Sequence, residues 1–271
     1  MPITPTAIYP SLRDKNVLIT GGAEGIGAAA VELFCRQSSN VWFFDIAVSS
    51  AEKLVEHITK LKPAHEDFPI SVPKFLQCDV TDLEQARVCY DQVACEAGDM
   101  DVLVNNAATP GARSRVSSEE VTPESWEADM NVNLRHVFFL TQLVVPGMRE
   151  RSGGCIINMG SIIWRIPAAG LPVYAAAKAA IMGLTKTHSK EFGPDIRVNS
   201  VVPGAISTER QDREIYARNP AYRNEVLQQQ ALKRHLEPME VASVILFLAS
   251  DDSSGVTGSN YVVDGGWVGD V

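Results

Sequence analysis

Tyr174 and Lys178 stand four residues apart in the run VYAAAKAAIMGL. Residues at i and i+4 share one face of a helix, so this spacing would bring a phenol and an ammonium into the same small volume. An unperturbed tyrosine titrates near roughly 10, too high for proton exchange at neutral pH, and a neighbouring cation would favour the phenolate. The pair therefore predicts a proton-transfer site, although such a pair also arises by chance on surface helices. Ser161, in the segment INMGS, precedes it after a strand-like apolar stretch.

A glycine-rich turn lies near the amino terminus. Residues 16–20, NVLIT, indicate a strand, and GGAEGIGAAAVELFCRQ follows with helical periodicity. Glycines at Gly21, Gly25 and Gly27 allow a tight turn and close approach of backbone to a pyrophosphate, and the helix amino terminus supplies N–H donors. The spacing G-x-x-x-G-x-G differs from the G-x-G-x-x-G fingerprint, so an ordinary turn is the alternative.

The next strand ends in an acid. Residues 41–45, VWFFD, place Asp45 where dinucleotide-binding folds place a carboxylate against the ribose hydroxyls, roughly 20 residues beyond the turn. A carboxylate there would repel a 2′-phosphate, and Glu24, inside the glycine turn, adds a second negative charge on the same side. We therefore expect NAD to be preferred over NADP. The alternative is that Asp45 only begins the turn after its strand.

Length and composition indicate a single domain spanning residues 1–271. An α/β chain of this length often remains one unit, and 45% hydrophobic residues suffice for one large core. The net charge of −9, without any block of basic residues, argues against nucleic acid or an anionic membrane as the main partner. We expect a small-molecule partner and no metal site.

The cysteines and the amino terminus indicate a soluble cytoplasmic protein. The five cysteines are odd in number and lack a C-x-x-C pair, so we expect them to be reduced and buried. The first residues, MPITPTAIYPSL, have neither a basic start nor the apolar core of a signal peptide. The longest apolar stretch, VFFLTQLVV, is too short to cross a membrane.

Strand and helix patterns alternate along the middle of the chain. The strand-like segments KFLQC, DVLVNNA, CIINM and IRVNSVV are separated by helix-like stretches at 83–96, through residue 147, and around Tyr174. This alternation predicts parallel strands with helices on both faces of the sheet. Residues 61–74 form an extended proline-containing loop to which we assign no function.

The last third has a different texture. Residues 205–237 are rich in charged and amide side chains and are typical of a mobile helical lid over the strand ends rather than of a second domain. Residues 241–249 then predict a closing helix, and SNYVVDGG predicts an edge strand. The closing helix and the final VVDGGW segment would serve as interfaces in an oligomer, although a core helix and an edge strand would look the same.

In this order, the motifs resemble the short-chain dehydrogenases/reductases over essentially the whole chain. The resemblance implies a Rossmann-type, doubly wound seven-stranded parallel sheet of order 3-2-1-4-5-6-7, with helices on both faces, and assembly into a homotetramer or homodimer. Two positions depart from the family pattern: Ala108 replaces the glycine of NNAG, and Gly160 replaces the first serine of Ser-Ser. The matching motifs are TGGAEGIG at 20–27, CDV around Asp79, NNA at 105–107, NVNL with Asn133, Ser161, Tyr174-x-x-x-Lys178, and PGAIST at 203–208.

The resemblance also implies roles for single residues. Tyr174 is the implied general acid or base; Lys178 lowers its pKa and binds the nicotinamide ribose, and Ser161 holds the substrate oxygen. Asn133 is implied to bind a water that relays protons from Lys178 to solvent, with an ordinary helix amide as the alternative. Asp79 would alternatively cap the following helix, and both roles are compatible. The implied cofactor contacts are Gly21, Gly25, Ile26 and Gly27 at the pyrophosphate, Asp79 and Val80 at the adenine, Asn106 beside the adenosine ribose, and Pro203, Ile206 and Thr208 around the nicotinamide.

Further segments resemble the sugar dehydrogenases of this family, the xylose-oxidising ones in particular. Those enzymes oxidise an aldose at the anomeric carbon to a lactone. Trp164 would stack on a sugar, and Arg165, Arg210 and Gln211 would donate to its hydroxyls; a core tryptophan and solvated charges are the alternatives. The apolar PAAGLPV, residues 167–173, could equally flank a hydrophobic substrate. The shared segments are AIYPSL at 7–12, NVNLRH at 131–136, GSIIW at 160–164, VVPG at 201–204, TERQ at 208–211 and LFLASDDSS at 246–254.

Three functions therefore stay open. The first is an NAD-dependent sugar or polyol dehydrogenase that transfers hydride between nicotinamide and a carbinol or carbonyl carbon. The second is a carbonyl reductase of a larger apolar ketone in a biosynthetic pathway. The third is a non-catalytic nucleotide-binding protein, against which the complete set of catalytic-type side chains argues.

Overall fold

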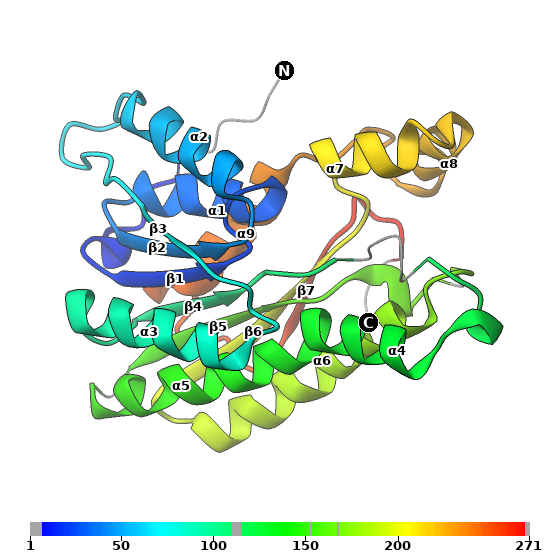
Figure 1. The fold of residues 1–271 in the computed structure, drawn as a ribbon. Coiled ribbons are helices and arrows are strands. Elements are labelled where there is room, and N and C mark those ends of the chain that lie inside the picture. Colours follow the sequence, from blue (N-terminus) through cyan, green and yellow to red (C-terminus); the bar gives the residue numbers. More distant parts are fainter. Residues whose placement is uncertain (1–6, 110–114, 152, 167, 269–271) are drawn as a thin grey trace.

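A fully parallel, seven-stranded sheet forms the centre of the molecule (Figure 1), and its strand order is β3-β2-β1-β4-β5-β6-β7. The computed structural model describes residues 7–109, 115–151, 153–166 and 168–268. The strand order confirms the fold class expected from the sequence, with β7 at an edge. The strands are β1 (Asn16–Thr20), β2 (Asn40–Asp45), β3 (Lys74–Gln77), β4 (Val102–Asn105), β5 (Gly154–Met159), β6 (Ile196–Pro203) and β7 (Asn260–Val263).

Helices cover both faces of the sheet (Figure 1), with α1, α2 and α9 on one face and α3, α5 and α6 on the other. Helix α2 lies in a stretch for which the sequence patterns predicted no element. The helices are α1 (Gly25–Cys35), α2 (Val48–Thr59), α3 (Leu83–Ala97), α4 (Pro123–Met130), α5 (His136–Glu150), α6 (Pro172–Phe192), α7 (Glu209–Gln211), α8 (Pro220–Gln229) and α9 (Pro238–Ala249), with π-helical turns at Asn131–Arg135 and Asp212–Tyr216 and 3-10 turns at Pro10–Leu12, Ser118–Glu120, Ile162–Trp164 and Asp251–Ser253.

The central strands are short apolar runs because both of their faces are covered. Every residue of β1 is buried, as is every residue of β4, which is the pattern of a parallel sheet packed between two helix layers. The predicted closing helix is α9, and its apolar side chains, such as Val241 and Ile245, are buried in the core cluster that also contains α1. The apolar face of this helix is therefore buried in the core of its own chain.

The strand order reverses between β1 and β4, which creates the crevice in which this fold class binds ligands. Strands β1 and β4 pair in parallel, and their chains depart to opposite faces of the sheet. The crevice lies outside the carboxyl ends of these strands. The glycine turn after β1 and the segment after β4 therefore become neighbours, although more than 80 residues separate them, as in the pair Asn106 and Thr20 (|i−j| = 86).

Residues 205–237 form a helical excursion whose two ends meet. Ile206 and Leu236 make an isolated parallel bridge, and Ser207 N donates to Leu236 O at 2.8 Å. Between these points lie α7, the second π turn and α8, which stand above the sheet (Figure 1). A compact segment closed at its neck can pack and move as a unit.

Two further expectations concern membrane-spanning helices and the cysteines. None of the described helices combines the length and apolar character needed to span a bilayer. All five cysteines are free thiols, and Cys35, Cys78, Cys89 and Cys155 are buried as expected. Cys95 is exposed, contrary to the expectation, because it lies on the outer face of α3.

Candidate active site

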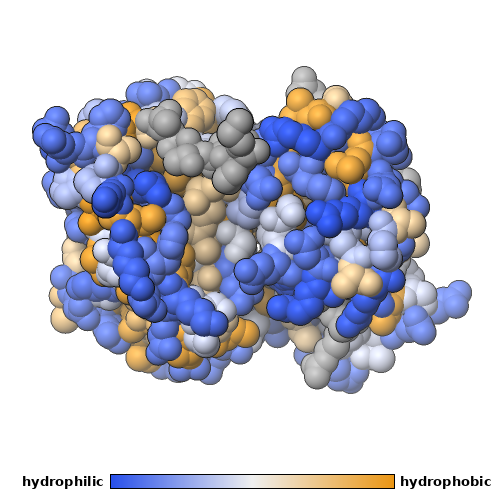
Figure 2. All heavy atoms as spheres, turned by 90° about the horizontal axis from the view of Figure 1, so that it is seen from above, coloured by the Kyte–Doolittle hydropathy of each residue, from blue (hydrophilic) through white to orange (hydrophobic). Residues whose placement is uncertain are grey.

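A cavity of about 1240 Å³ opens at the carboxyl ends of the central strands. The glycine turn, the segment after β4, the loop after β5, α6 and the 205–237 segment all contribute to its lining. Seen from above, the surface is hollowed between the side that carries α2 and the side that carries α7 and α8 (Figure 2). This cavity brings together most of the residues that the sequence singled out.

The glycine turn has the backbone conformation that its sequence predicts. Gly21 and Gly25 have positive φ angles of 64° and 57°, which L side chains rarely adopt. A Cβ on Gly27 would meet Gly21 O and would lie 2.6 Å from Asn106 Nδ2. Gly21, Gly25 and Ile26 line the cavity, whereas Gly27 lies beneath them and permits the close packing of the turn.

The two predicted carboxylates are placed differently: Glu24 lies within this turn, whereas Asp45, at the end of β2, is not among the residues that line the cavity. Asp45 Oδ2 accepts from Ala23 N at 2.9 Å, and its Oδ1 accepts from Ala47 N at 2.9 Å. Asp45 therefore braces the glycine turn from the end of β2. Glu24 lines the cavity, and its Oε1 accepts from Ser50 Oγ at 2.7 Å.

Asp79 and Val80 are not among the residues that line the cavity. Asp79 Oδ1 accepts from the backbone and hydroxyl of Thr81, at 2.9 and 2.7 Å, and so closes a local turn. The alternative reading of Asp79 as a helix cap is not what the structure shows, because Asp82 caps α3 through the amides of Glu84 and Gln85. Val80 is buried.

The segment after β4 is fixed by hydrogen bonds from several elements. Thr20 Oγ1 accepts from the amides of Asn106 and Ala107, both at 3.0 Å. The Asn106 amide group donates to Thr20 O and to Gly21 O. His136, at the start of α5, lies 3.0 Å from Ala107 O through Nε2. These contacts bind the glycine turn to the opposite side of the crevice.

His136 is a residue of this site to which the sequence assigned no role. Burial, together with the charge of Lys178, lowers its pKa to about 3, so the ring is neutral and Nε2–H donates to Ala107 O. Its Nδ1 has no partner within the described part of the chain. The only sequence signal for it was its presence in the shared segment NVNLRH.

Asn133 lies in the π-helical turn between α4 and α5 and is fully buried. Its Oδ1 accepts from Thr109 N at 3.1 Å, and its Nδ2 donates to Thr109 O at 3.0 Å and to Asp129 O at 2.9 Å. The side chain thus holds the backbone of Thr109 through two hydrogen bonds. A π turn interrupts regular helical hydrogen bonding and is frequent at functional sites, so this position combines a structural amide with an irregular backbone.

Ser161, Tyr174 and Lys178 converge at the carboxyl end of β5, as the sequence predicted. Ser161 begins a 3-10 turn, accepts from Ile163 N at 3.2 Å, and hydrogen-bonds the Tyr174 hydroxyl. Lys178 is 2% exposed, and its Nζ donates to Met159 O at 2.8 Å. The Lys178 Nζ lies 5.7 Å from the centroid of the Tyr174 ring. The helix geometry therefore places the phenol and the amine on one face, one turn apart.

The charges around the phenol differ from the sequence-based interpretation. Burial raises the pKa of Tyr174, while the Ser161 hydrogen bond and the charges of Arg210 and Arg115 lower it less than burial raises it. Burial, with a smaller contribution from Arg210, lowers the pKa of Lys178 to about 7. Lys178 is therefore neutral where the phenol ionises, and the described cations that lower the pKa of the phenol are Arg210 and Arg115.

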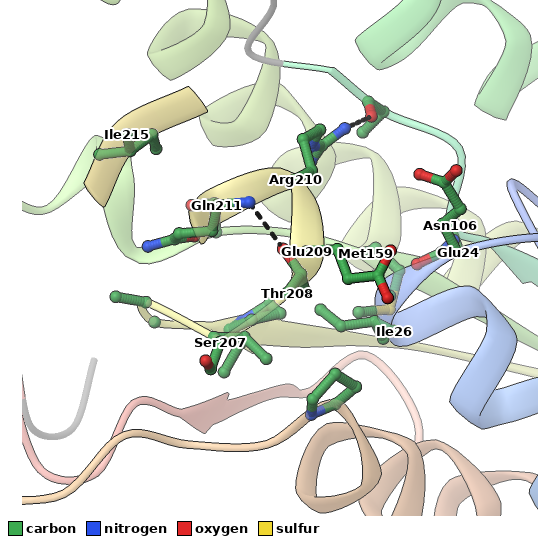
Figure 3. A pocket seen from close by; sticks show the side chains of 18 of the residues that line it. Glu24, Ile26, Asn106, Met159, Ser207, Thr208, Glu209, Arg210, Gln211 and Ile215 are labelled. Atoms are coloured by element: carbon green, nitrogen blue, oxygen red, sulfur yellow. Dashed lines mark hydrogen bonds between the residues drawn. The ribbon is translucent and has the colours of Figure 1, made fainter. Parts of the chain in front are cut away.

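The residues expected around the nicotinamide line the cavity opposite the glycine turn. Pro203, Ile206 and Thr208 all contribute to the lining. Thr208 Oγ1 accepts from Gln211 N at 3.1 Å and so caps the short helix α7 (Figure 3). Its methyl group faces the glycine turn, since a Cβ on Gly25 would lie 3.2 Å from Thr208 Cγ2.

The four residues expected to bind substrate fall into two groups. Arg210 and Gln211 line the cavity, and Arg210 Nη1 donates to Ala108 O at 3.2 Å (Figure 3). Gln211 Nε2 donates to the Tyr216 hydroxyl at 3.1 Å. Trp164 and Arg165 are not among the lining residues. Trp164 instead packs on an apolar cluster beneath the site, and the Arg165 guanidinium lies 5.6 Å from its ring.

Sequence reasoning missed two lining residues that carry chemistry. Trp267, near the carboxyl terminus, supplies the aromatic surface that Trp164 was expected to give, and Arg115 supplies a cation. Of the apolar run 167–173, Ala168, Ala169 and Leu171 line the cavity, and Pro167 lies outside the described residues. Within those residues no group of His, Cys, Asp or Glu is arranged to hold a metal ion.

A doubly wound sheet with a glycine turn opposite a serine, tyrosine and lysine defines a nicotinamide-dependent oxidoreductase, and the comparisons with known proteins give the family. A family model described as enoyl-(acyl carrier protein) reductase matches residues 21–268. D-xylose 1-dehydrogenase of Caulobacter vibrioides is 43% identical over 97% of this chain and 99% of its own, and a probable galactose dehydrogenase of Rhizobium meliloti is 41% identical over 97% and 98%. The chain belongs to the short-chain dehydrogenase/reductase family.

Solved structures agree with this assignment. The aldohexose dehydrogenase of Thermoplasma acidophilum superposes with a TM-score of 0.81 at 29% identity, covering 96% of each chain. A 3-oxoacyl-[acyl-carrier protein] reductase of Brucella melitensis with bound NAD gives a TM-score of 0.84 at 30% identity, covering 100% of this chain and 99% of its own. The protein is thus an oxidoreductase that acts on CH–OH donors or the matching carbonyls with a nicotinamide cofactor.

The structure fits such a cofactor. The positive φ angles of Gly21 and Gly25 leave the turn without side chains where a pyrophosphate would approach. The cavity runs without interruption from this turn, past Asn106, to Tyr174. A dinucleotide could therefore contact the turn with its pyrophosphate while its nicotinamide faces the phenol.

Proposed function

We propose that this protein is an NAD-dependent sugar or polyol dehydrogenase that oxidises an aldose at the anomeric carbon to a lactone. The observation that carries the proposal is the likeness, over nearly the whole chain, to proteins named as D-xylose and galactose dehydrogenases, joined to a complete Ser161, Tyr174 and Lys178 centre in the cavity. Arg210 and Gln211, with Trp267, give that cavity the donors and the aromatic face that sugars require.

The side chains divide the chemistry among themselves. When bound, the nicotinamide accepts the hydride from the carbinol carbon. Ser161 holds the substrate oxygen, and Tyr174, as phenolate, removes its proton while the carbonyl forms. Lys178 reaches the ribose of the cofactor and fixes it beside the phenol. The charges of Arg210 and Arg115 and the hydrogen bond from Ser161 stabilise the phenolate against the effect of burial.

The preference for NAD rests on Asp45 and Glu24. Glu24 lies within the glycine turn and Asp45 contacts it, so a 2′-phosphate there would meet their negative charge. Asp45 is partly exposed, and its backbone contacts leave it beside the place where this fold class seats the adenosine ribose. Asp79, Val80 and Asn106 would contact the adenosine half.

The proton leaves the site through the neighbourhood of Asn133. Both Nδ2 hydrogens of Asn133 are used by Thr109 and Asp129, and Oδ1 accepts one bond from Thr109. The water that relays protons from Lys178 to solvent would therefore be held by the remaining acceptor site of Oδ1 or by the irregular backbone of the π turn.

Mobility and assembly complete the proposal. The 205–237 segment is a lid, closed at its neck by Ile206 and Leu236. We further expect one domain over residues 1–271, a homotetramer or homodimer, and a cytoplasmic location. Light scattering of the purified protein measures the assembly, and a stable monomer would contradict it.

One observation favours a second candidate, a reductase of apolar ketones. Ile163, Ile166, Ala168 and Leu171 give the cavity an apolar wall. An apolar wall stabilises a hydrophobic substrate better than a polyhydroxylated one.

A substrate panel decides between the two candidates. The purified enzyme is assayed by the absorbance of reduced nicotinamide, with NAD or NADP, against aldoses, polyols and secondary alcohols, and in reverse against apolar ketones. Steady turnover of a pentose or hexose with NAD is the expected result. Absence of turnover with every sugar, together with NADPH-dependent reduction of apolar ketones, would replace the first candidate by the second.

A further inference from the structure

Arg210 joins the 205–237 segment to the opposite wall of the cavity through a side-chain hydrogen bond. Its Nη1 donates to Ala108 O at 3.2 Å, between residues 102 positions apart (Figure 3). The wall that it meets is held rigidly, because Thr20 fixes the amide of Ala107 and Asn133 fixes Thr109 on either side of Ala108. The lid is therefore fastened to a fixed point at this guanidinium.

Arg210 also belongs to the immediate surroundings of the catalytic pair. It lines the same cavity as Ser161, Tyr174 and Lys178, and its charge acts on both titrating groups, lowering the pKa of the phenol and the pKa of the amine. The neighbours that face the phenol are Ser161, Arg115 and Lys178. His136 also lies close enough to Lys178 for their charges to interact, but it is neutral at physiological pH.

The contacts of the residues next to Arg210 in the chain explain why its side chain stays beside Ala108. Thr208, the N-cap of helix α7, has its methyl group against the glycine turn, and Gln211, one residue beyond Arg210, donates to the Tyr216 hydroxyl. The first turn of the lid is thus held by contacts on both sides of Arg210. A guanidinium keeps its charge at all working pH values and has several donors in a fixed plane, so it can bond a carbonyl and still present charge elsewhere.

We propose that Arg210 is a positioning residue that fastens the 205–237 segment to the Ala108 carbonyl and thereby holds a fixed positive charge in the cavity that Tyr174 lines. This role is additional to the recognition of sugar hydroxyls. It depends on the dehydrogenase chemistry of the family and is independent of which alcohol is oxidised. Because Arg210 is exposed, solvent screens its charge, and the expected effect is moderate.

Three variants separate the hydrogen bond to Ala108 O from the positive charge of Arg210. Arg210→Lys keeps the charge, Arg210→Gln keeps a donor without charge, and Arg210→Met removes both. Arg218→Gln is the matched control, since Arg218 lies on the same segment and lines the cavity but does not act on the pKa of Tyr174 or Lys178.

The first readout is the pH profile of kcat for oxidation. In Arg210→Gln and Arg210→Met the rise of kcat should move to higher pH, with kcat at neutral pH lowered about threefold to tenfold, because loss of the charge leaves burial to raise the pKa of the phenol. The opposing change, a more protonated Lys178, is smaller because burial is the main cause of its low pKa. Arg210→Lys should restore the wild-type profile, and Arg218→Gln should share it.

The second readout needs neither substrate nor cofactor. The ultraviolet absorbance of tyrosinate is titrated in each variant, and the same titration in a Tyr174→Phe background is subtracted, which leaves the signal of Tyr174. In Arg210→Gln this phenol should ionise at higher pH than in the wild type. An unchanged titration and pH profile, with only a raised KM for the alcohol that the enzyme oxidises, would overturn the proposal and leave Arg210 with substrate binding alone; the titration itself is read without any substrate.

Discussion

The two walls of the cavity are held in opposite ways. The glycine wall, residues 20–27 with 105–109, is fixed by backbone groups and short buried side chains, as in the bonds from Asn106 and Ala107 to Thr20. The 205–237 segment is joined at its neck by Ile206 and Leu236, and beyond it by single contacts such as Leu232 N to Gly265 O at 3.1 Å and Arg210 Nη1 to Ala108 O. The comparison teaches that the pyrophosphate side of the cavity is built into the sheet, whereas the opposite side, including Ile206 and Thr208, is carried by a helical excursion.

The catalytic centre stands between these walls, and its removal should have the largest effect. Tyr174→Phe deletes the hydroxyl that exchanges the proton, so kcat should fall roughly 10²–10⁴-fold. Cofactor binding should be nearly unchanged, because the glycine wall is untouched. Steady-state kinetics and calorimetric titration with NAD measure both quantities, and full turnover in the variant would refute the role of the phenol.

The packing of the glycine wall can be tested by adding one methyl group at Gly27. Gly27→Ala places a methyl group against Gly21 O and 2.6 Å from Asn106 Nδ2, so the free energy of unfolding should fall by about 1–3 kcal/mol and NAD affinity should fall with it. Gly183→Ala is the control, because nothing lies within 4 Å of the added methyl group; that variant should gain about 0.5–1 kcal/mol in helix α6. Equal effects of the two changes, by thermal and urea unfolding, would contradict the account of the turn.

Burial of Lys178 should lower the free energy of unfolding of the protein. The pKa of Lys178 is about 7 in the folded protein against 10.5 for an ordinary lysine, so between these pH values the unfolded chain binds the extra proton and stability rises with pH. Lys178→Met should remove this slope and raise the free energy of unfolding by about 2 kcal/mol at neutral pH, while abolishing activity. Urea unfolding across this pH window tests the claim, with Lys53→Met, an exposed lysine, as the control. A destabilised Lys178→Met protein with an unchanged slope would contradict the low pKa.

Cofactor choice is expected to show the smallest effect. The double variant Glu24→Gln and Asp45→Asn keeps the side-chain shapes and removes both negative charges, so the ratio of kcat/KM for NADP to that for NAD should rise about tenfold. Glu209→Gln, a carboxylate on the opposite wall of the cavity, should leave the ratio unchanged. An equal response of both variants would mean that the preference lies elsewhere.

The part of this site predictable from sequence is the part held by backbone. The turn at Gly21 and Gly25 and the strand end at Asp45 are as expected because positive φ and a strand end are local features, whereas the contact of Asp45 with a cofactor stays a prediction. Trp164 was expected in the cavity but packs beneath it, while Trp267 lines the cavity from the far end of the chain.

Contacts over long sequence separation explain the other omissions. Arg115 and His136 matter because the strand order brings their segments to Tyr174 and Ala107, and no local pattern shows this. Lys178 was assigned the charge that lowers the pKa of the phenol, but burial, which a sequence does not quantify, makes that amine neutral first. The resemblance to a family supplied the fold and the catalytic set; the distribution of charge required the structure.

The measurement that tests the central claim most directly is the fate of the hydrogen on the anomeric carbon. An aldose carrying deuterium at that carbon is oxidised with NAD, and the reduced cofactor and the sugar product are analysed by mass spectrometry. The account predicts deuterium in the reduced nicotinamide and a lactone as product, with neither formed by Tyr174→Phe. Reduced cofactor without deuterium, or no reaction with any aldose while other alcohols are oxidised, would contradict it.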